Sequence, residues 1–453
     1  MDQTSATHPE ASASSAALME RIGARTAEIA VVGLGYVGLP LCAALSDGGY
    51  RVTGYDIDPA KAEKLNRGET YLTHFPAARV AEMLGRGFHA TTKIARLSDA
   101  DAILICVPTP LSRNREPDLG FIVSTAESLV PVLKPGVLVV LESTTYPGTT
   151  TEVLKPILER SGLKSEDGIF IAYSPEREDP GNADYATSRI PKIVGGEGPR
   201  AAALALELYR NAVAEVIPVR DTRTAEAVKL TENIFRSVNI ALVNELKLVY
   251  GAMGIDVWDV IDAASTKPFG FMPFYPGPGL GGHCIPIDPF YLTWKAREFD
   301  APVRFVELAG EINTAMPHII VDRTSAALND VFGKGLKGSR ILVVGIAYKK
   351  NVDDIRESPA LKIIELLEAR GAETAYHDPF VEEIGPSRDH AALAGRRSVR
   401  LGADTAGSYD LVVIITDHSA IDWQALVASA RLVIDTRNAT RDVTAHREKI
   451  LKA

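Results

Sequence analysis

From Glu28 onward, short runs rich in β-branched residues alternate with longer helical stretches. This alternation predicts parallel strands joined by crossover helices, which together form a doubly wound α/β sheet. The first set of predicted strands spans residues 28–33, 51–56, 101–107, 137–143, 168–174 and 192–196.

The pattern changes at Thr222, where one long helical stretch begins. Residues 222–253 contain no proline, and no glycine before Gly251. A helix this long, with apolar residues on more than one side, is expected to join two domains and to pack against a second copy of the chain. After Gly338 the alternation returns, and further strands are predicted at 340–345, 373–378, 409–416 and 431–436.

These patterns predict four segments. Residues 1–26 are rich in Ala, Ser and Thr, and we expect a flexible tail there, because they lack the positive start and apolar stretch of a signal peptide. The remaining segments are a first Rossmann-like domain at 27–220, a central helical domain at 221–330 and a second Rossmann-like domain at 331–453. The fold class is therefore α/β, with two doubly wound parallel sheets joined by a long central helix.

Composition narrows the classes of function. The 453 residues carry a net charge of −9, so there is no overall basic field for nucleic acid or an anionic membrane, and an anionic ligand needs local cations. No run reaches the roughly 18 apolar residues of a membrane helix. Three cysteines, at positions 42, 106 and 284, provide neither a disulfide framework nor metal-ligand spacing. We expect no metal site and a reducing, cytoplasmic setting.

A glycine motif follows the first predicted strand. Gly33, Gly35 and Gly38 open a helix in the sequence Gly-Leu-Gly-Tyr-Val-Gly, and Asp56 closes the next strand. The first two glycines permit a tight turn and close approach of a pyrophosphate, and the third lets helix pack on strand. A carboxylate at Asp56 suits a free ribose hydroxyl, which favours NAD over NADP. The cofactor-binding residues predicted in this motif are Gly33, Gly35, Tyr36, Val37, Gly38 and Asp56.

The second half of the chain repeats this local pattern. AVVGLG near the start is matched by LVVGIA at 342–347, and YDIDP by YHDP at 376–379. The similarity is explained either by gene duplication or by sequence patterns that unrelated α/β proteins share, and the sequence leaves the choice open. In either case a nucleotide-sized cleft is expected at each sheet.

Two loops at strand ends lie where a cofactor is expected. The first contains Val107, Pro108 and Thr109, and the second contains Thr144. Ordinary turn chemistry also explains each of them.

A glycine-rich loop leads to the third cysteine. The segment Phe274-Tyr-Pro-Gly-Pro-Gly-Leu-Gly-Gly-His-Cys284 has the flexibility to surround a ligand closely, and Asp288 follows four residues later. Cys284 therefore fits an accessible nucleophile with an acid or base nearby. His283 either activates this thiol or points elsewhere, since neighbouring side chains in an extended segment diverge. Cys42 and Cys106 lie in apolar segments and are expected to be core residues.

Polar residues on the long helix and after one strand complete the candidate chemistry. Lys229 and Asn233 are one helical turn apart, so they can stabilise an oxyanion together or belong to a solvated stripe. Glu176 and Glu178 bring two carboxylates to a strand end, where active-site loops gather.

Taken together, these motifs resemble the nucleotide-sugar 6-dehydrogenases, the family of UDP-glucose and UDP-N-acetylhexosamine dehydrogenases. The resemblance extends from Glu28 to about Thr440. It implies an NAD-binding domain, a central dimerising helix and a UDP-binding domain. It also implies a four-electron oxidation of a sugar C6 alcohol to a carboxylate, in two NAD-dependent steps through a thiohemiacetal and a thioester on a cysteine.

The resemblance assigns roles to individual residues. Cys284 matches the nucleophile, Lys229 and Asn233 the oxyanion-stabilising pair, and Asp288 the residue that positions or activates water. Glu176 matches a carboxylate proposed for proton transfer, and Thr144 a hydroxyl that orients water. The substrate-binding residues implied by the resemblance are Glu176, Arg177, Glu178, Lys229, Asn233, Phe274, Tyr275, Gly279, Gly281, Lys349 and Arg437, with Arg356 meeting the cofactor.

At one position the sequence differs from the UDP-glucose enzymes of this family, and the difference bears on the substrate. UDP-glucose enzymes commonly carry a lysine directly before the catalytic aspartate, whereas this chain has Ile287 before Asp288. The surrounding motifs resemble the N-acetylhexosamine branch. We expect UDP-N-acetylglucosamine as the substrate, with UDP-N-acetylmannosamine and UDP-glucose as alternatives, and a product used for surface polysaccharide.

Two other kinds of function remain open at this stage. One is a two-electron dehydrogenase of the hydroxyacid type, which needs no cysteine. The other is a silent NAD-binding scaffold, although Lys229, Asn233, Cys284 and Asp288 are all present. The expected partners are a UDP-sugar and a second copy of the chain, as a homodimer or larger homo-oligomer, with neither nucleic acid nor membrane.

Overall fold

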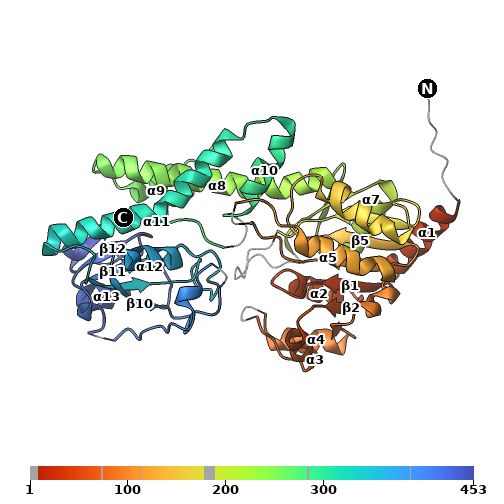
Figure 1. Cartoon of the computed structure of the whole chain (residues 1–453), viewed down its shortest axis with the longest axis horizontal. Coiled ribbons are helices and arrows are strands. Elements are labelled where there is room, and N and C mark those ends of the chain that lie inside the picture. Colours follow the sequence, from red (N-terminus) through yellow and green to blue (C-terminus); the bar gives the residue numbers. More distant parts are fainter. Residues whose placement is uncertain are drawn as a thin grey trace. The chain divides into compact units, whose positions relative to one another are not determined.

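The computed structural model describes residues 9–72, 75–112, 114–177, 189–282, 285–387, 389–402 and 404–453. The chain divides into two compact units (Figure 1). The first unit comprises Met1–Glu232 and Phe290–Ala301, and the second comprises Asn233–Pro289 and Pro302–Ala453.

The first unit contains an eight-stranded sheet in the order β3-β2-β1-β4-β5-β6-β7-β8. Its strands are β1 (Glu28–Val32), β2 (Arg51–Tyr55), β3 (His89–Thr91), β4 (Ala102–Ile105), β5 (Val137–Leu141), β6 (Ile169–Tyr173), β7 (Lys192–Gly196) and β8 (Val216–Pro218). All six strands predicted in this part of the sequence are present. The three-residue strands β3 and β8 were not predicted, because so short a segment has no clear periodicity.

The expectation of an entirely parallel first sheet is wrong at one pair of strands. β7 runs antiparallel to β6, with Ala172 opposite Gly196 and Tyr173 opposite Gly195, while the other pairs are parallel. β7 therefore begins at the edge of the sheet where β6 ends.

The central strands are buried on both faces by two hydrophobic clusters. In β1, Ile29 and Val31 contribute to one cluster, and Ala30 and Val32 to the other, as the two-residue period of a strand requires. The α-helices described before the long central helix are α1 (Pro9–Gly23), α2 (Gly38–Asp47), α3 (Pro59–Asn66), α4 (Ala77–Gly85), α5 (Gly120–Leu129), α6 (Lys155–Leu158) and α7 (Pro199–Arg210).

Residues 9–26 correct the prediction of a flexible tail over residues 1–26, of which residues 1–8 lie outside the described residues. Residues 9–23 form helix α1, in which Leu18 and Ile22 are fully buried in the core of the first unit. These two residues are one helical turn apart and so face the same way, and the alanine-rich sequence around them favours a helix. Tyr50 also donates a hydrogen bond to the Ile22 carbonyl oxygen at 3.1 Å.

The long helix predicted at 222–253 is confirmed as α8 (Thr222–Ala252), which begins in the first unit and ends in the second. The helices that follow are α9 (Val257–Ser265), α10 (Asp288–Ala296) and α11 (Arg304–Phe332). The sequence analysis identified no element over α11, whose pattern is interrupted by Gly310 and Pro317. The proposed limits of the three folded domains stay predictions. Within the described residues, no helix is both long and apolar enough to span a bilayer.

The second unit contains a five-stranded parallel sheet in the order β10-β9-β11-β12-β13. This order matches β2-β1-β4-β5-β6 of the first sheet. The two halves of the chain, whose local sequence patterns are alike, therefore share a strand order as well. The predicted fold class, with two doubly wound sheets and a long central helix, is confirmed. The elements are β9 (Arg340–Val344), β10 (Glu373–His377), β11 (Leu411–Ile414), β12 (Val433–Asp435), β13 (Ile450–Lys452), α12 (Pro359–Ala369) and α13 (Trp423–Ser429).

Candidate active site

The turn after β1 has the geometry expected of a dinucleotide-binding turn. Gly33 adopts a positive φ of 93°, and a Cβ atom there would lie 2.5 Å from the Cys106 carbonyl oxygen. A Cβ atom at Gly38 would lie 1.8 Å from the Gly33 carbonyl oxygen, so only glycine allows α2 to start there. At Gly35, by contrast, a Cβ atom would meet nothing within 4 Å. The backbone at Gly35 is thus open on the side where a pyrophosphate would approach.

Asp56 follows β2 and closes this turn. Its side chain is buried and accepts hydrogen bonds from the backbone N–H groups of Leu34 at 2.9 Å and Asp58 at 3.0 Å. Lys61 Nζ lies 3.1 Å from one of its oxygens. The carboxylate is therefore fixed beside the glycine turn, where a ribose hydroxyl is held in Rossmann domains.

The loops after β4 and β5 are linked to each other. Thr109 Oγ1 donates to the Thr144 carbonyl oxygen at 2.8 Å, and Ser143 Oγ donates to the Val107 carbonyl oxygen at 2.7 Å. The structure therefore brings together two of the predicted cofactor loops at one edge of the sheet.

The neighbouring Thr145 is a candidate that the sequence analysis missed. Its side chain is fully buried, and within the described part of the chain its hydroxyl has no hydrogen-bond partner. A buried hydroxyl of this kind is available to a bound water or ligand group. The adjacent Thr144, which the sequence favoured, is half-buried. No sequence signal distinguishes two consecutive threonines in a loop.

Glu176 follows β6 and is held by its neighbours. Lys229 Nζ donates to the Glu176 carbonyl oxygen, and the Arg177 backbone N–H donates to its carboxylate at 2.7 Å. Arg177 also pairs with Glu232 at 2.6 Å. The structure thus brings together the predicted residues Glu176, Arg177 and Lys229. Glu178 lies outside the described residues.

In the second unit, the structure brings together Asn233 on α8 and Asp288 at the start of α10. Asn233 Nδ2 donates to Asp288 Oδ2 at 2.6 Å, and both side chains are buried. Fifty-five positions separate them in the sequence. The pair places an amide donor and a carboxylate at the C-terminal side of the glycine loop.

The glycine loop packs closely against its own chain. A Cβ atom at Gly277 would lie 2.5 Å from the Arg437 guanidinium, and one at Gly281 would lie 2.7 Å from Tyr348 Cβ. The Gly282 backbone N–H donates to the Arg356 carbonyl oxygen at 3.1 Å. This internal packing accounts for the small residues, which the sequence analysis had attributed to ligand contact alone. Ligand contact at Gly279 and Gly281 stays a prediction, and His283 and Cys284 lie outside the described residues.

A buried asparagine holds the same loop. Asn244 accepts a hydrogen bond from the Gly277 backbone N–H and donates one to Asn313 Oδ1, each at 2.9 Å. Asn313 in turn donates to the Ser237 carbonyl oxygen at 3.0 Å. These contacts fix the path of the loop toward position 284.

The two aromatic residues predicted to bind the substrate pack on other rings. Phe274 meets Phe235 edge to face at 5.6 Å between centroids, and Tyr275 stacks on Trp258 at 5.3 Å. Their contact with the substrate stays a prediction.

The turn after β9 repeats the geometry of the turn after β1. Gly345 has a φ of 80°, and Asp378 accepts from the Ile346 backbone N–H at 2.7 Å, as Asp56 does from Leu34. In addition, fully buried His418 pairs with Asp378 at 3.0 Å, and the Asn351 backbone N–H donates to His418 Nδ1 at 3.0 Å. This arrangement fixes the loop that carries Lys349.

The three cations predicted in this unit have different surroundings. Arg356 makes a two-pronged contact with Asp354, with its shortest bond at 2.6 Å, and Lys349 is half-buried. Arg437 Nε donates to the Ile415 carbonyl oxygen at 3.2 Å, and burial lowers its pKa. A diphosphate is well suited to such groups.

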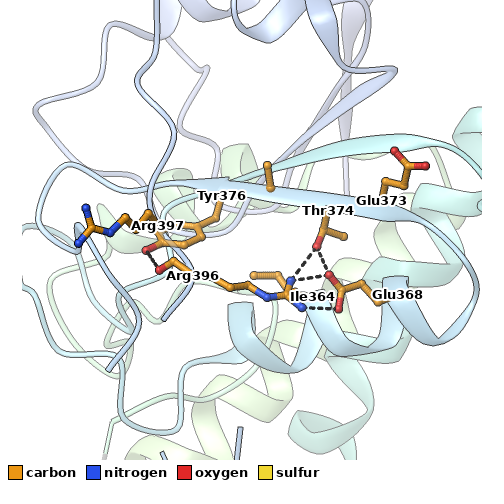
Figure 2. A pocket seen from close by; sticks show the side chains of 8 residues that line it. Ile364, Glu368, Glu373, Thr374, Tyr376, Arg396 and Arg397 are labelled. Carbon is orange, nitrogen blue, oxygen red and sulfur yellow. Dashed lines mark hydrogen bonds and ion pairs between the residues drawn. The ribbon is translucent and has the colours of Figure 1, made fainter. Parts of the chain in front are cut away.

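A pocket of about 490 Å³ opens beside edge strand β10 (Figure 2). Figure 2 shows Arg396 pointing at Glu368 and Thr374, and Arg396 Nη1 and Nη2 donate to the Glu368 carboxylate at 2.5 and 2.9 Å. The charge of Arg396 is already paired with Glu368. We therefore interpret these pocket residues as a structural salt bridge and not as a ligand site. The pocket contains none of the predicted site residues.

Cys42 and Cys106 are buried, as the sequence predicted, and burial raises the pKa of each thiol well above its ordinary value. Neither thiol is therefore a nucleophile.

A glycine turn with a ribose-type carboxylate, repeated in a second sheet of the same strand order, defines a protein with two Rossmann-type, nucleotide-binding units. Comparison with known families then identifies the family within this class. Three domain models of the UDP-glucose/GDP-mannose dehydrogenase family match this chain: the NAD binding domain over residues 27–213, the central domain over 223–315 and the UDP binding domain over 342–442. The chain belongs to this family and is an NAD-dependent UDP-sugar dehydrogenase.

Individual relatives cover almost the whole chain. A UDP-N-acetyl-D-mannosamine dehydrogenase of Salmonella typhi is 35% identical over 91% of this chain and 99% of its own length. A UDP-N-acetyl-D-glucosamine 6-dehydrogenase of Pseudomonas aeruginosa is 35% identical over 86% of this chain and 90% of its own. The solved structure of a UDP-D-ManNAc dehydrogenase from Pyrococcus horikoshii superposes with a TM-score of 0.82 at 35% identity, and covers 91% of this chain and 96% of that one.

Proposed function

We propose that this enzyme oxidises the C6 hydroxyl of UDP-N-acetyl-D-glucosamine to the carboxylate, with two NAD consumed per sugar. The observation that carries the proposal is the set of polar residues around the glycine loop, with Asn233 hydrogen-bonded to Asp288 just after position 284. The product, a UDP-N-acetylhexosaminuronic acid, would serve surface polysaccharide synthesis in the cytoplasm.

When bound, NAD would supply the hydride acceptor for both oxidations at C6. In the first oxidation a base takes the hydroxyl proton as the hydride leaves C6, which gives the aldehyde. The Cys284 thiolate then adds to the aldehyde and forms a thiohemiacetal. In the second oxidation a base takes the hydroxyl proton of the thiohemiacetal as the remaining hydride leaves C6, which gives a thioester. A base takes a proton from the attacking water, the C–S bond breaks to release the thiolate, and the acid loses its proton to solvent to give the carboxylate.

The remaining residues have supporting roles in this scheme. Lys229 and Asn233 would stabilise the oxyanions, Asp288 would position or activate the water, and Glu176 would transfer protons. Burial of Lys229, Asn233 and Asp288 supports these roles, because polar groups act more strongly where water is excluded. We also propose Thr144 for orienting water. Phe274, Tyr275, Lys349 and Arg437 would bind the UDP-sugar, and Arg356 the cofactor.

The epimer UDP-N-acetyl-D-mannosamine is the second candidate substrate. Relatives at 35% identity carry both names, so identity alone does not favour either sugar. Few side chains read a single acetamido stereocentre. UDP-glucose ranks below both, because Ile287 occupies the position where the UDP-glucose enzymes commonly carry a lysine.

We also propose that the enzyme is a homodimer or a larger homo-oligomer formed through α8. Phe235, Leu242 and Val249 follow one another at seven-residue intervals on this helix, and their side chains are 48%, 49% and 43% exposed. Seven residues make two helical turns, so the three side chains form one apolar stripe. A stripe of this kind on a long helix fits an isologous contact with a second copy.

The test of the reaction is the number of NADH formed per sugar consumed. Purified protein is given UDP-N-acetylglucosamine, UDP-N-acetylmannosamine or UDP-glucose separately at equal concentration. We expect two NADH per UDP-N-acetylglucosamine. One NADH per sugar would indicate a two-electron enzyme, no NADH with any of the three would indicate a silent scaffold, and faster turnover of the manno epimer would reverse the order of the two candidate substrates.

A further inference from the structure

Lys192 is a buried cation at the catalytic edge of the first sheet. It is the first residue of β7, and its side chain is 5% exposed. Because β7 is antiparallel to β6, the first residue of β7 lies at the edge of the sheet where β4, β5 and β6 end. Continuing the register in which Tyr173 faces Gly195 places Glu176 opposite Lys192.

The Lys192 ammonium lies between two carboxylates. Its Nζ atom is 2.5 Å from Glu142 Oε2 and 3.9 Å from Glu176 Oε2. Glu142 is fully buried directly after β5, and the Tyr209 hydroxyl donates to its other oxygen. An ammonium has three donors and only one is directed at Glu142, so Lys192 can also attract Glu176.

The charges explain why this cation stays ionised. Burial by itself lowers the pKa of Lys192, but Glu142 and Glu176 together raise it above its ordinary value. Burial raises the pKa of Glu142, while Lys192 and Tyr209 stabilise its charged form. Glu142 therefore serves as a fixed counter-ion that keeps Lys192 charged and in place.

Glu176 is thus held at two points by two lysines. Lys229 binds its backbone carbonyl oxygen, and Lys192 faces its carboxylate. The Arg177 backbone N–H donates to Glu176 Oε1 at 2.7 Å and Lys192 Nζ lies 3.9 Å from Oε2, so the two carboxylate oxygens meet different groups and the direction of the carboxylate is restrained.

We propose that Lys192, anchored by Glu142 and Tyr209, is a positioning residue that orients the Glu176 carboxylate for proton transfer during sugar oxidation. This inference rests on the proposed function, since it assigns the site's geometry to that reaction. Lys192 acts through Glu176 and needs no contact with substrate or cofactor.

The test is Lys192→Met, which retains the length of the side chain and removes the charge. We expect kcat to fall by about 10- to 100-fold, the effect of a misplaced catalytic group, while KM for NAD stays within about twofold. The pH profile of kcat is recorded for both proteins. Lys192→Arg should recover part of the lost kcat.

Two controls separate positioning from folding. Lys155→Met removes another lysine of the first unit, whose Nζ lies 3.0 Å from Glu197, and should leave kcat and its pH profile unchanged. Lys192→Met leaves Glu142 buried without its counter-ion, so the double variant Lys192→Met/Glu142→Gln is measured as well. We expect the double variant to unfold near the wild-type midpoint and to show the same loss of kcat.

A double-mutant cycle with Glu176→Gln then tests the route of action. If Lys192 acts through Glu176, Lys192→Met should lower kcat much less in the Glu176→Gln background than in the wild type. Equal effects in both backgrounds, or a folded Lys192 variant with wild-type kcat and pH profile, would overturn this inference alone. A wild-type protein that forms no NADH from any UDP-sugar would overturn the proposed function together with it.

Discussion

At the scale of single residues, the candidate site consists of polar groups fixed by the backbone around them. Asp56 is held by two backbone N–H groups and a lysine, and Asn233 is held by Asp288. Such restraints place a side chain before the substrate arrives, so little reorganisation is needed during the reaction. The contribution of one residue can then be isolated by an isosteric substitution.

Cys284→Ser is the substitution that tests the covalent mechanism. We expect it to abolish formation of the acid while NAD binding persists, because a serine hydroxyl is a far weaker nucleophile than a thiolate and the glycine turn is untouched. Acid production is followed by NADH absorbance, and NAD binding by calorimetry. Cys42→Ser is the matched control, since that thiol is buried in α2 and should affect stability only. Undiminished acid formation by Cys284→Ser would contradict the thioester route.

Glu226 provides a pH-dependent prediction. This buried residue of α8 accepts hydrogen bonds from the Gly148 and Thr150 backbone N–H groups at 2.6 and 2.8 Å. Burial nevertheless raises its pKa from 4.5 to about 7. Between these two pH values the unfolded chain releases the proton that the folded chain retains, so the free energy of unfolding falls as pH rises through this window and levels off above about 7.

The comparison is with Glu226→Gln, in which this residue cannot titrate. From pH 5 to pH 8 the wild type should lose about 2–3 kcal/mol of unfolding free energy relative to the variant. Urea unfolding at several pH values measures the difference. Parallel pH curves for the two proteins would show that the carboxyl is already ionised in the folded state at pH 5.

At the scale of elements, the direction of one strand decides which residues meet. If β7 were parallel to β6, Lys192 would lie at the opposite edge of the sheet from Glu142 and Glu176. Its reversal brings the cation to the edge where the cofactor loops end. Helix α1 shows a second effect at this scale. It lies outside the predicted first domain, yet its buried residues cover the core of the first unit.

Ile22→Ala tests the contribution of α1. Removing a fully buried isoleucine should lower the free energy of unfolding by about 2–5 kcal/mol, because it loses apolar burial and leaves a cavity. Thermal or urea unfolding measures the effect, and Glu20→Ala, at an exposed position on the same helix, is the control and should cost far less. Equal stabilities of the two variants would restore the prediction of a tail without structural function.

At the scale of the whole molecule, two Rossmann-type units share one helix. The first carries the open glycine turn at Gly35, and the second carries the Asn233–Asp288 pair and the arginines. The proposed reaction needs a cofactor and a UDP-sugar at the same time, so each unit supplies a different part of the chemistry. The exposed stripe of α8 adds the proposed contact with a second copy.

Leu242→Glu tests that contact at the centre of the stripe. A charge in the middle of an apolar interface should raise the dimer dissociation constant by about 30-fold or more, the effect of losing about 2 kcal/mol. Sedimentation analysis over a range of concentrations measures it. Phe305→Glu, which replaces an exposed phenylalanine of α11, is the control and should leave the dimer intact. A wild-type protein that sediments as a monomer would contradict the proposed interface.

Much of the architecture could be read from the sequence because it is encoded locally. The alternation of apolar runs predicted ten strands, and Gly33, Gly35, Gly38 and Asp56 predicted the cofactor turn, since strand periodicity and glycine conformations are properties of short segments. The glutamate that directly follows the apolar strand β5 was a further signal, because a carboxylate there requires a buried partner.

Only the tertiary structure identified those partners. The reversal of β7, the meeting of Lys192 with Glu142 and Glu176, the burial of Thr145 and the packing of α1 all depend on contacts between segments far apart in the chain. The sequence by itself determined that this protein has two nucleotide-binding sheets, a long helix and a candidate thiol. The fold decided which charges face one another. Pairing of distant groups depends on strand direction and packing, and local sequence periodicity determines neither of them.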